Sequence, residues 1–160
     1  MKIKSRVQLR KSAKNKLLTS LRSSFGDVID KIADKKLESA TADWFHIIIV
    51  DGDILFIQED DHPFPTVRGV LELDLDCHKV TVDAGAVRFV VNGADIMSPG
   101  IVAADPEIVE NDLVIITEET HGKPLAIGRA LVPASEMVGK SGKAVKSIHH
   151  VGDDLWNLEA

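Results

Sequence analysis

The residues best suited to binding chemistry lie in one segment, positions 83–100, with the sequence DAGAVRFVVNGADIMSPG. Asp83 can cap a first helical turn, and Asn92-Gly93 supplies the left-handed ending that helices commonly use. Between them, three valines recur at the i, i+3, i+4 spacing of a short helix. Gly85 leaves the backbone unshielded at the helix entrance, where the amides carry the positive end of the helix dipole. A phosphate or a base edge can approach there, although an ordinary turn, helix and turn fits the same spacing.

A phosphate-binding loop is incomplete in this sequence. Lys140 and Lys143 lie in the glycine-rich stretch GKSGKA, which invites that interpretation. The motif requires a glycine five positions before its second glycine, and those positions hold Ala134 and Met137. We interpret the stretch as a flexible turn that can contact an anion.

Motifs for catalysis and for metal binding also fail. Asp74, Asp76, Cys77 and His78 are metal-type side chains, but neighbours in an extended segment point to opposite faces and cannot close on one ion. The pair His149-His150 fails the same test. No serine lies in a Gly-x-Ser-x-Gly elbow, and the carboxylates Glu118-Glu119 are expected in a solvated turn. The sequence therefore predicts a protein that is not an enzyme and has no metal and no cofactor.

The elements that position these residues begin with two helices. Leucines at positions 17, 18 and 21 recur at helical spacing among lysines, which indicates a basic amphipathic helix over residues 12–21 that ends at Phe25-Gly26. A second short helix is expected over residues 28–33, with Asp27 as its cap.

Strands follow after residue 36. Residues 45–50 and 54–57 are rich in β-branched side chains, and Asp51-Gly52-Asp53 between them is a hairpin signal. His62-Pro63-Phe64-Pro65 is expected to stop regular structure, and Thr66 to cap a short helix.

The second half of the chain reads as a small barrel or sandwich. Turn signals recur about every ten residues and separate short apolar stretches. We expect strands near residues 80–82, 101–103, 113–117, 125–131, 144–149 and 155–158.

Charge is distributed unevenly along the 160 residues. Residues 1–36 contain eleven basic and three acidic residues, a net charge of +8, whereas residues 37–160 contain eight and twenty-two, a net charge of −14. We therefore favour two domains, the first with a basic arm suited to nucleic acid or another acidic surface, although a solvated helix face fits equally. No apolar run reaches the roughly 18–20 residues of a membrane span, and the start lacks a secretory signal. With Cys77 as its only cysteine, the protein is expected to be soluble and cytoplasmic.

Residues 82–100, followed by NDLV at 111–114, AIGRA at 126–130 and GKAV at 142–145, resemble the PUA domain, an RNA-binding module named after pseudouridine synthases and archaeosine transglycosylases. The most specific parts are Asp83-x-Gly85-Ala86, Gly93-Ala94, Pro99-Gly100 and the closing HHVGDDLW at 149–156. Asn111 replaces a glycine common in relatives, a tolerable change because asparagine accepts left-handed turns.

The first half is similar to the domain that precedes the PUA module in the family of the malignant T-cell-amplified sequence protein and its archaeal counterparts. The similarity rests on the basic helix, the hairpin IIIVDGDILFI and the segment PFPTVR at 63–68. The resemblance implies an α+β fold: an N-terminal α/β pre-PUA domain over residues 1–77 and a PUA-type β pseudobarrel over residues 78–160.

In that family RNA lies against the short helix, its glycine loop and the last strands. The resemblance thereby implicates Gly85, Ala86, Arg88, Gly93, Ala94, Lys143, His149 and His150. Arg88 and Lys143 can neutralise phosphates, and the histidines can stack or donate hydrogen bonds. For the two alanines, tight packing of the helix on the barrel is the alternative.

The predicted PUA domain is acidic overall. Residues 83–160 contain six basic and twelve acidic residues. This excess of negative charge disfavours binding to RNA phosphates. We therefore expect Lys11 and Lys14 to add positive charge, together with Arg22 and with Lys4 or Arg10 if the helix extends that far.

The sequence predicts non-catalytic binding of structured RNA, either tRNA or small-subunit rRNA, in translation or RNA maturation. One alternative is a protein-interaction adaptor whose acidic surface docks a translation factor. A further alternative is a detached specificity domain of a tRNA-modifying enzyme.

Overall fold

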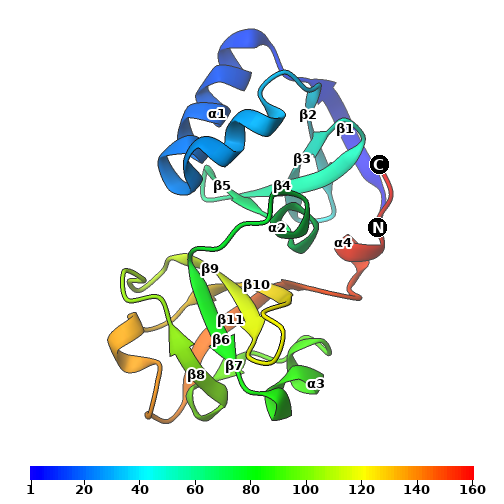
Figure 1. Cartoon of the computed structure of the whole chain (residues 1–160). Coiled ribbons are helices and arrows are strands. Elements are labelled where there is room, and N and C mark those ends of the chain that lie inside the picture. The colour runs from blue at the N-terminus through cyan, green and yellow to red at the C-terminus, as the bar shows by residue number, and fades with distance from the viewer. The chain divides into compact units, whose positions relative to one another are not determined.

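The computed structural model describes residues 1–160, which form two compact units (Figure 1). The N-terminal unit comprises residues 1–75 and 157–160, and the C-terminal unit comprises residues 76–156. Each unit combines one β-sheet with short helices, in agreement with the predicted α+β class.

The N-terminal unit contains a five-stranded antiparallel sheet in the order β1-β2-β3-β4-β5. Helices α1 and α2 lie on opposite faces of this sheet (Figure 1). The strands are β1 (Ile3–Gln8), β2 (Leu37–Ala42), β3 (Phe45–Val50), β4 (Asp53–Glu59) and β5 (His62–Pro65), and the helices are α1 (Lys11–Phe25), the 3₁₀ helix η1 (Gly26–Ile32) and α2 (Val67–Leu73).

Helix α1 confirms the predicted amphipathic helix. Leu17, Leu18 and Leu21 are its buried residues, and Gly26 ends it with a left-handed φ of 78°. The next predicted helix is a 3₁₀ helix that starts earlier than expected, so Asp27 lies in its first turn and does not cap it. Its apolar residues still point inward, because Ile29 and Ile32 are buried.

The first residues of the chain form a strand, which corrects the proposed extension of the basic helix. Strand β1 pairs antiparallel with β2, and Arg6 donates two hydrogen bonds of 2.9 and 3.0 Å to Glu38 across that pair. The helix begins at Lys11 after an extended Arg10. Lys4 and Arg10 therefore share no helical face with Lys11 and Lys14.

The predicted hairpin is confirmed, and the segment after it is more regular than expected. Asp51 and Gly52 have φ values of 46° and 92°, as a tight hairpin turn requires. Residues 62–65 form strand β5 despite their two prolines, because β5 is an edge strand and leaves its outer side unpaired. Thr66 caps α2, since its hydroxyl accepts a 3.1 Å hydrogen bond from the Gly69 amide.

The C-terminal unit contains a nearly closed six-stranded sheet in the order β7-β11-β10-β9-β6-β8. Its interior is filled by aliphatic side chains, among them Val80, Val114, Ile116 and Val145. The strands are β6 (Lys79–Val82), β7 (Ile96–Met97), β8 (Ile101–Ala104), β9 (Leu113–Glu118), β10 (Pro124–Ala130) and β11 (Lys143–His150). The helices are η2 (Ala84–Ala86), α3 (Val87–Val90), η3 (Ser98–Gly100), η4 (Ala134–Glu136) and α4 (Asp154–Asn157).

The predicted last strand is a helix. Residues 154–157 form α4, because the carboxylate of Asp153 accepts a 2.7 Å hydrogen bond from the Trp156 amide and so begins a helical turn. Leu155 fills the interior beneath this turn and is 3% exposed, whereas Trp156 is only half-buried.

Glu118 also departs from expectation, because it is buried at the end of β9. Its carboxylate accepts hydrogen bonds of 2.7–2.9 Å from the backbone amides of Thr120, His121 and Lys123, and so holds the turn that leads into β10. The bond from the Lys123 amide is the main cause that lowers the pKa of Glu118 below its usual value, against the opposing effect of desolvation.

We expect the Glu118→Gln variant to be less stable than the wild type at neutral pH and equally stable in acid. Because the pKa of Glu118 is lower in the folded state, the carboxylate contributes stability above its unfolded pKa of about 4.3, and that contribution is lost as the pH falls through the folded value. Urea unfolding at pH 7 and pH 3 measures the difference. Glu136→Gln, at an exposed carboxylate, is the control, and a Glu118→Gln difference that does not shrink as the pH falls would contradict the assignment.

Candidate nucleic-acid interface

Segment 83–100 belongs to the C-terminal unit, and a hydrogen bond holds its two ends together. The Asp83 side chain accepts a 2.9 Å hydrogen bond from the Ala86 amide, which caps η2, and α3 follows at once. Gly93, with a φ of 90°, ends the helical part as predicted. The Asp83 amide donates to the Gly100 carbonyl over 2.9 Å, so the two ends of the segment are held together.

This segment encloses a pocket of about 590 Å³. Six of its lining residues are Gly85, Ala86, Phe89, Ala94, Met97 and Pro99, and the other five also belong to the segment. The lining is mainly apolar, and the side chains of Phe89 and Met97 remain 55% and 46% exposed. Open aromatic and thioether surface of this kind suits a flat apolar group such as a nucleobase.

The entrance at Gly85 is acidic, which changes the chemistry expected there. The Ala84 amide donates to the Glu119 carboxylate over 3.2 Å, and the Ala86 amide donates to Asp83. The amides on both sides of Gly85 are thus occupied by carboxylates, and the negative charge of these carboxylates repels a phosphate. Gly85 itself is exposed, and a Cβ there would lie 3.5 Å from Asp83 Oδ1, so the fold does not demand glycine at this position.

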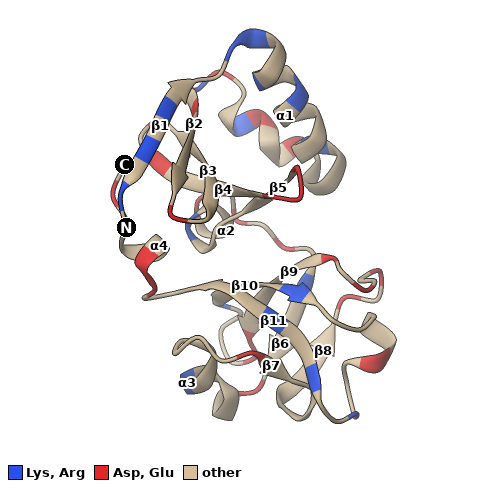
Figure 2. Ribbon diagram, turned by 180° about the vertical axis from the view of Figure 1, so that it is seen from behind, with Lys and Arg blue, Asp and Glu red and all other residues tan.

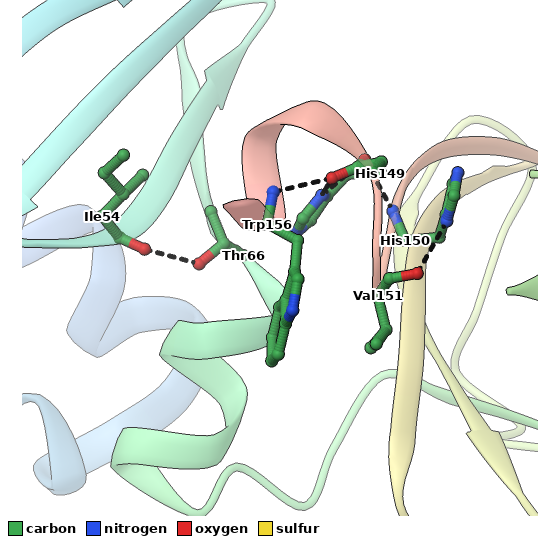
Figure 3. A network of polar contacts seen from close by, with 7 residues as sticks. Ile54, Thr66, His149, His150, Val151 and Trp156 are labelled. Carbon is green, nitrogen blue, oxygen red and sulfur yellow. Dashed lines mark hydrogen bonds and ion pairs between the residues drawn. The ribbon is translucent and has the colours of Figure 1, made fainter. Parts of the chain in front are cut away.

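The two adjacent histidines occupy different environments. His149 is 1% exposed, and its Nδ1 lies 2.9 Å from Asp153 Oδ2. Burial disfavours the charge of Asp153, but hydrogen bonds from His149 and from the amides of Trp156 and His150 outweigh it and lower the pKa of Asp153. His149 therefore organises the turn before α4 (Figure 3), and its burial removes it from the RNA surface predicted from the sequence.

His150 remains a candidate contact. Its Nδ1 lies 2.9 Å from the Val151 carbonyl (Figure 3). Because a carbonyl only accepts, Nδ1 carries the proton, and in the neutral ring Nε2 is left as an acceptor. A Cβ on Gly93 would lie 3.1 Å from that Nε2, so the glycine loop and the last strand meet here.

The two predicted cations flank the pocket. Arg88 lies on α3 with its guanidinium 4.8 Å from the centre of the Phe89 ring. Lys143 is paired with Met97 in the sheet, and its Nζ lies 3.2 Å from Asp95 Oδ2. Asp95 also accepts a hydrogen bond from the Ser147 amide, and this bond, with the contribution of Lys143, lowers the pKa of Asp95. Figure 2 shows basic and acidic residues interspersed over this unit.

The remaining predicted residues divide between the two units. Ala86 and Ala94 line the pocket. Ala86 is also closely packed, because a Cβ added to Gly100 would lie 3.2 Å from the Cβ of Ala86. Lys11 and Lys14 lie on α1 in the N-terminal unit, where the Lys14 ammonium donates a 2.7 Å hydrogen bond to the Lys35 carbonyl.

The sequence did not identify Phe89, Met97 or Glu119. A signal for the first two exists: Phe89 falls outside the apolar stripe of Val87, Val90 and Val91, and Met97 alternates with the buried Ile96. Glu119 is 35 residues from the amide it binds, and no local pattern indicates that contact.

The chain shows no group of three histidine, cysteine or acidic side chains placed to hold a metal ion. Burial and the neighbouring carboxylates raise the pKa of the Cys77 thiol, which disfavours the reactive thiolate. No helix combines the length and the apolar character that a membrane crossing requires.

Comparisons with known proteins show which families and structures this chain resembles. Residues 78–152 match the PUA domain. The uncharacterized protein MJ1432 of Methanocaldococcus jannaschii is 41% identical, with 99% of both chains covered. Translation machinery-associated protein 20 of Saccharomyces cerevisiae is 33% identical over 98% of this chain and 91% of its own. Malignant T-cell-amplified sequence 1 of Danio rerio is 27% identical over the same shares.

A solved structure has the same fold throughout. The hypothetical protein PH0734.1 of Pyrococcus horikoshii OT3 superposes with a TM-score of 0.87 at 38% identity, over 97% of this chain and 99% of that one.

Proposed function

Because the chain belongs to the PUA-domain family of translation machinery-associated protein 20 and the malignant T-cell-amplified sequence proteins, we propose that it binds structured RNA of the translation machinery, tRNA or small-subunit rRNA, without catalysis. The observation that carries the proposal is the apolar pocket of segment 83–100, with exposed Phe89 and Met97 at its surface. An unpaired base at an RNA end or in a loop is the group this pocket fits.

The charges around the pocket support recognition of a base rather than a phosphate inside it. Asp83 and Glu119 place negative charge at the Gly85 entrance, where a donor on a base edge is favoured and a phosphate is not. Arg88 and Lys143 lie outside the pocket and can meet the phosphates that flank the bound base. His150 adds an acceptor, its Nε2, beside Gly93 and outside the pocket lining.

Arg88 and Lys143 alone are expected to give a modest salt dependence. Two phosphate contacts to a single strand give a slope of about −1.4 in a plot of log affinity against log salt concentration. A steeper slope indicates further basic contacts, for which the N-terminal helix is the candidate.

Reversing Lys11 and Lys14 to glutamate tests that contribution. We expect weaker RNA binding and a salt slope reduced by roughly 1 to 2, because each lost phosphate contact removes about 0.7 from the slope for a single strand and about 0.9 for a duplex. Each single reversal changes the net charge by −2, and Lys123→Glu makes that same change at an exposed position of the C-terminal unit, so it controls for net charge when compared with each single variant. Unchanged affinity and slope in the double variant would exclude these lysines from the interface.

A second candidate function is favoured by the acidic balance of residues 83–160. In that case the chain is an adaptor whose acidic surface docks a translation factor. Crosslinking in cells followed by sequencing of bound RNA separates the two. Enrichment of tRNA or small-subunit rRNA supports direct binding of RNA. Recovery of no RNA above background would favour the adaptor function.

A further inference from the structure

We propose that the part of the N-terminal sheet that α1 leaves uncovered, near the β2–β3 hairpin, is a second RNA-binding surface, which binds single-stranded RNA by stacking a base on Trp44 at the tip of that hairpin. The inference rests on the proposed RNA-binding function and adds a separate surface to it. It starts from Trp44, which at 77% is the most exposed large apolar side chain of the chain.

The hairpin holds Trp44 in a fixed position. Strands β2 and β3 pair without a break from Leu37 opposite Val50 to Ala42 opposite Phe45, and Asp43 takes a φ of 51° in the two-residue turn. The Trp44 ring lies 5.6 Å from the ring of Phe45, which is buried. Because the backbone and the neighbouring ring already restrain Trp44, little conformational entropy is lost when a base stacks on it.

A row of polar side chains crosses the sheet one residue pair away from the turn that carries Trp44. The strand registers place Lys4 opposite Thr41, Thr41 opposite His46, and His46 opposite Gln58. Directly paired residues share a face, with side chains roughly 5 Å apart. Their chain neighbours Ala42, Phe45 and Ile57 are buried on the other face, so the row points outward.

The groups in this row are available for a ligand. Lys4 and His46 are exposed and Thr41 and Gln58 are half-buried, and the side chains of Lys4, His46 and Gln58 have no hydrogen bond or ion pair within the chain. An ammonium, an imidazole and an amide can together neutralise a phosphate and bind base edges.

The row leads into a groove between α1 and the sheet. This groove has a volume of about 500 Å³, and Gln58 belongs both to the row and to its lining. Lys16 and Ser39 also line it, with Asp61 as the acidic group. The surface therefore continues beyond Trp44 over four strands, about 14 Å at the usual strand spacing.

The composition of this surface favours RNA over a protein partner. Protein interfaces have an apolar centre with a polar rim, whereas here one aromatic ring stands beside a cationic and amide-bearing row. The row belongs to the unit that contains residues 1–36, with their net charge of +8, and the basic residues of β1 are visible in Figure 2. Residues 37–75 hold one basic and nine acidic residues, so the positive charge of this unit is local to β1, α1 and η1. A phosphate backbone is therefore expected to follow the β1 side of the row, where Lys4 lies.

The test uses the emission of Trp44 in the full chain. Trp156→Phe leaves Trp44 as the sole tryptophan, because the sequence contains two. Titration with a single-stranded RNA of about ten nucleotides is expected to quench Trp44 saturably. Trp44→Ala in the wild-type background is expected to weaken binding roughly tenfold by anisotropy, since base stacking on one aromatic ring contributes about 1–3 kcal/mol, and Trp44→Phe to retain most of the affinity.

Leu71→Ala is the matched control, because Leu71 is 53% exposed on α2 of the same unit. RNA binding with unchanged Trp44 emission, and a Trp44→Ala affinity within about twofold of the wild type, would overturn this inference and leave the pocket of segment 83–100 as the binding site. If the full chain binds no RNA at all, the proposed function fails with it.

Discussion

Replacing Phe89 by alanine is expected to weaken binding of tRNA or small-subunit rRNA fragments roughly 10- to 100-fold. The ring forms one wall of the pocket and is 55% exposed, so a base that enters the pocket stacks on it. Loss of one stacked aromatic removes about 1–3 kcal/mol, and 1.4 kcal/mol corresponds to a tenfold change in affinity. Fluorescence anisotropy with labelled RNA measures the effect.

The stability of the C-terminal unit is expected to change little in this variant. Phe89 is not part of the buried core, and exposed substitutions usually change stability by less than about 0.5 kcal/mol. Val109→Ala truncates a side chain that is 56% exposed outside the pocket lining and serves as the matched control. Equal RNA affinity for both variants would mean that no base enters this pocket.

The sequence predicts those parts of the fold that depend on neighbouring residues. The Asp51-Gly52 turn, the cap at Thr66 and the leucine stripe of α1 all follow from local patterns, and the structure confirms them. The Pro63–Pro65 segment was predicted incorrectly because its regularity depends on the position of β5 at the sheet edge, which a local pattern does not reveal.

The candidate site shows the same limit. Gly85, Ala86 and Ala94 lie within one short segment, and the structure brings them to one pocket. The carboxylate of Glu119 at the entrance and the approach of His150 to Gly93 depend on contacts between distant strands. The Glu119 contact places negative charge at the entrance, so the proposed preference for a base over a phosphate depends on the fold and not on a local sequence pattern.

His149 and His150 illustrate why pattern alone cannot assign roles. They are adjacent, and side chains on a strand alternate between faces, so one is expected inside and one outside. His149 is the inner one, because it is 1% exposed and its ring is held by Asp153.

The largest stability effect is expected at Gly69, where alanine should destabilise the N-terminal unit by roughly 3 kcal/mol or more. A Cβ at this position would overlap the carbonyl oxygen of Leu55 and lie 3.0 Å from its carbonyl carbon and 3.2 Å from Pro65 Cβ. Overpacking of a core typically costs about 1–3 kcal/mol, and overlap with backbone belongs at or above that range. Alanine is favoured over glycine within a helix by about 1 kcal/mol, which is too little to compensate.

The backbone around Gly69 has little freedom to relax. The Leu55 carbonyl accepts a 2.9 Å hydrogen bond from the Thr66 amide, and the Thr66 hydroxyl donates over 2.8 Å to the Ile54 carbonyl (Figure 3). Moving α2 away from β4 would break both bonds. Because these groups are buried, each unpaired partner adds about 1–3 kcal/mol to the cost.

Urea unfolding followed by Trp44 emission in the Trp156→Phe background measures this prediction, since Trp44 lies in the N-terminal unit. Leu71→Ala, on the exposed side of the same helix, is expected to stay within about 0.5 kcal/mol of its parent. Equal or greater stability for Gly69→Ala would mean that helix propensity outweighs the overlap, and that α2 can move from β4 without loss of the Thr66 hydrogen bonds. A large loss confined to Gly69→Ala would show that close approach of two backbones requires glycine at this position.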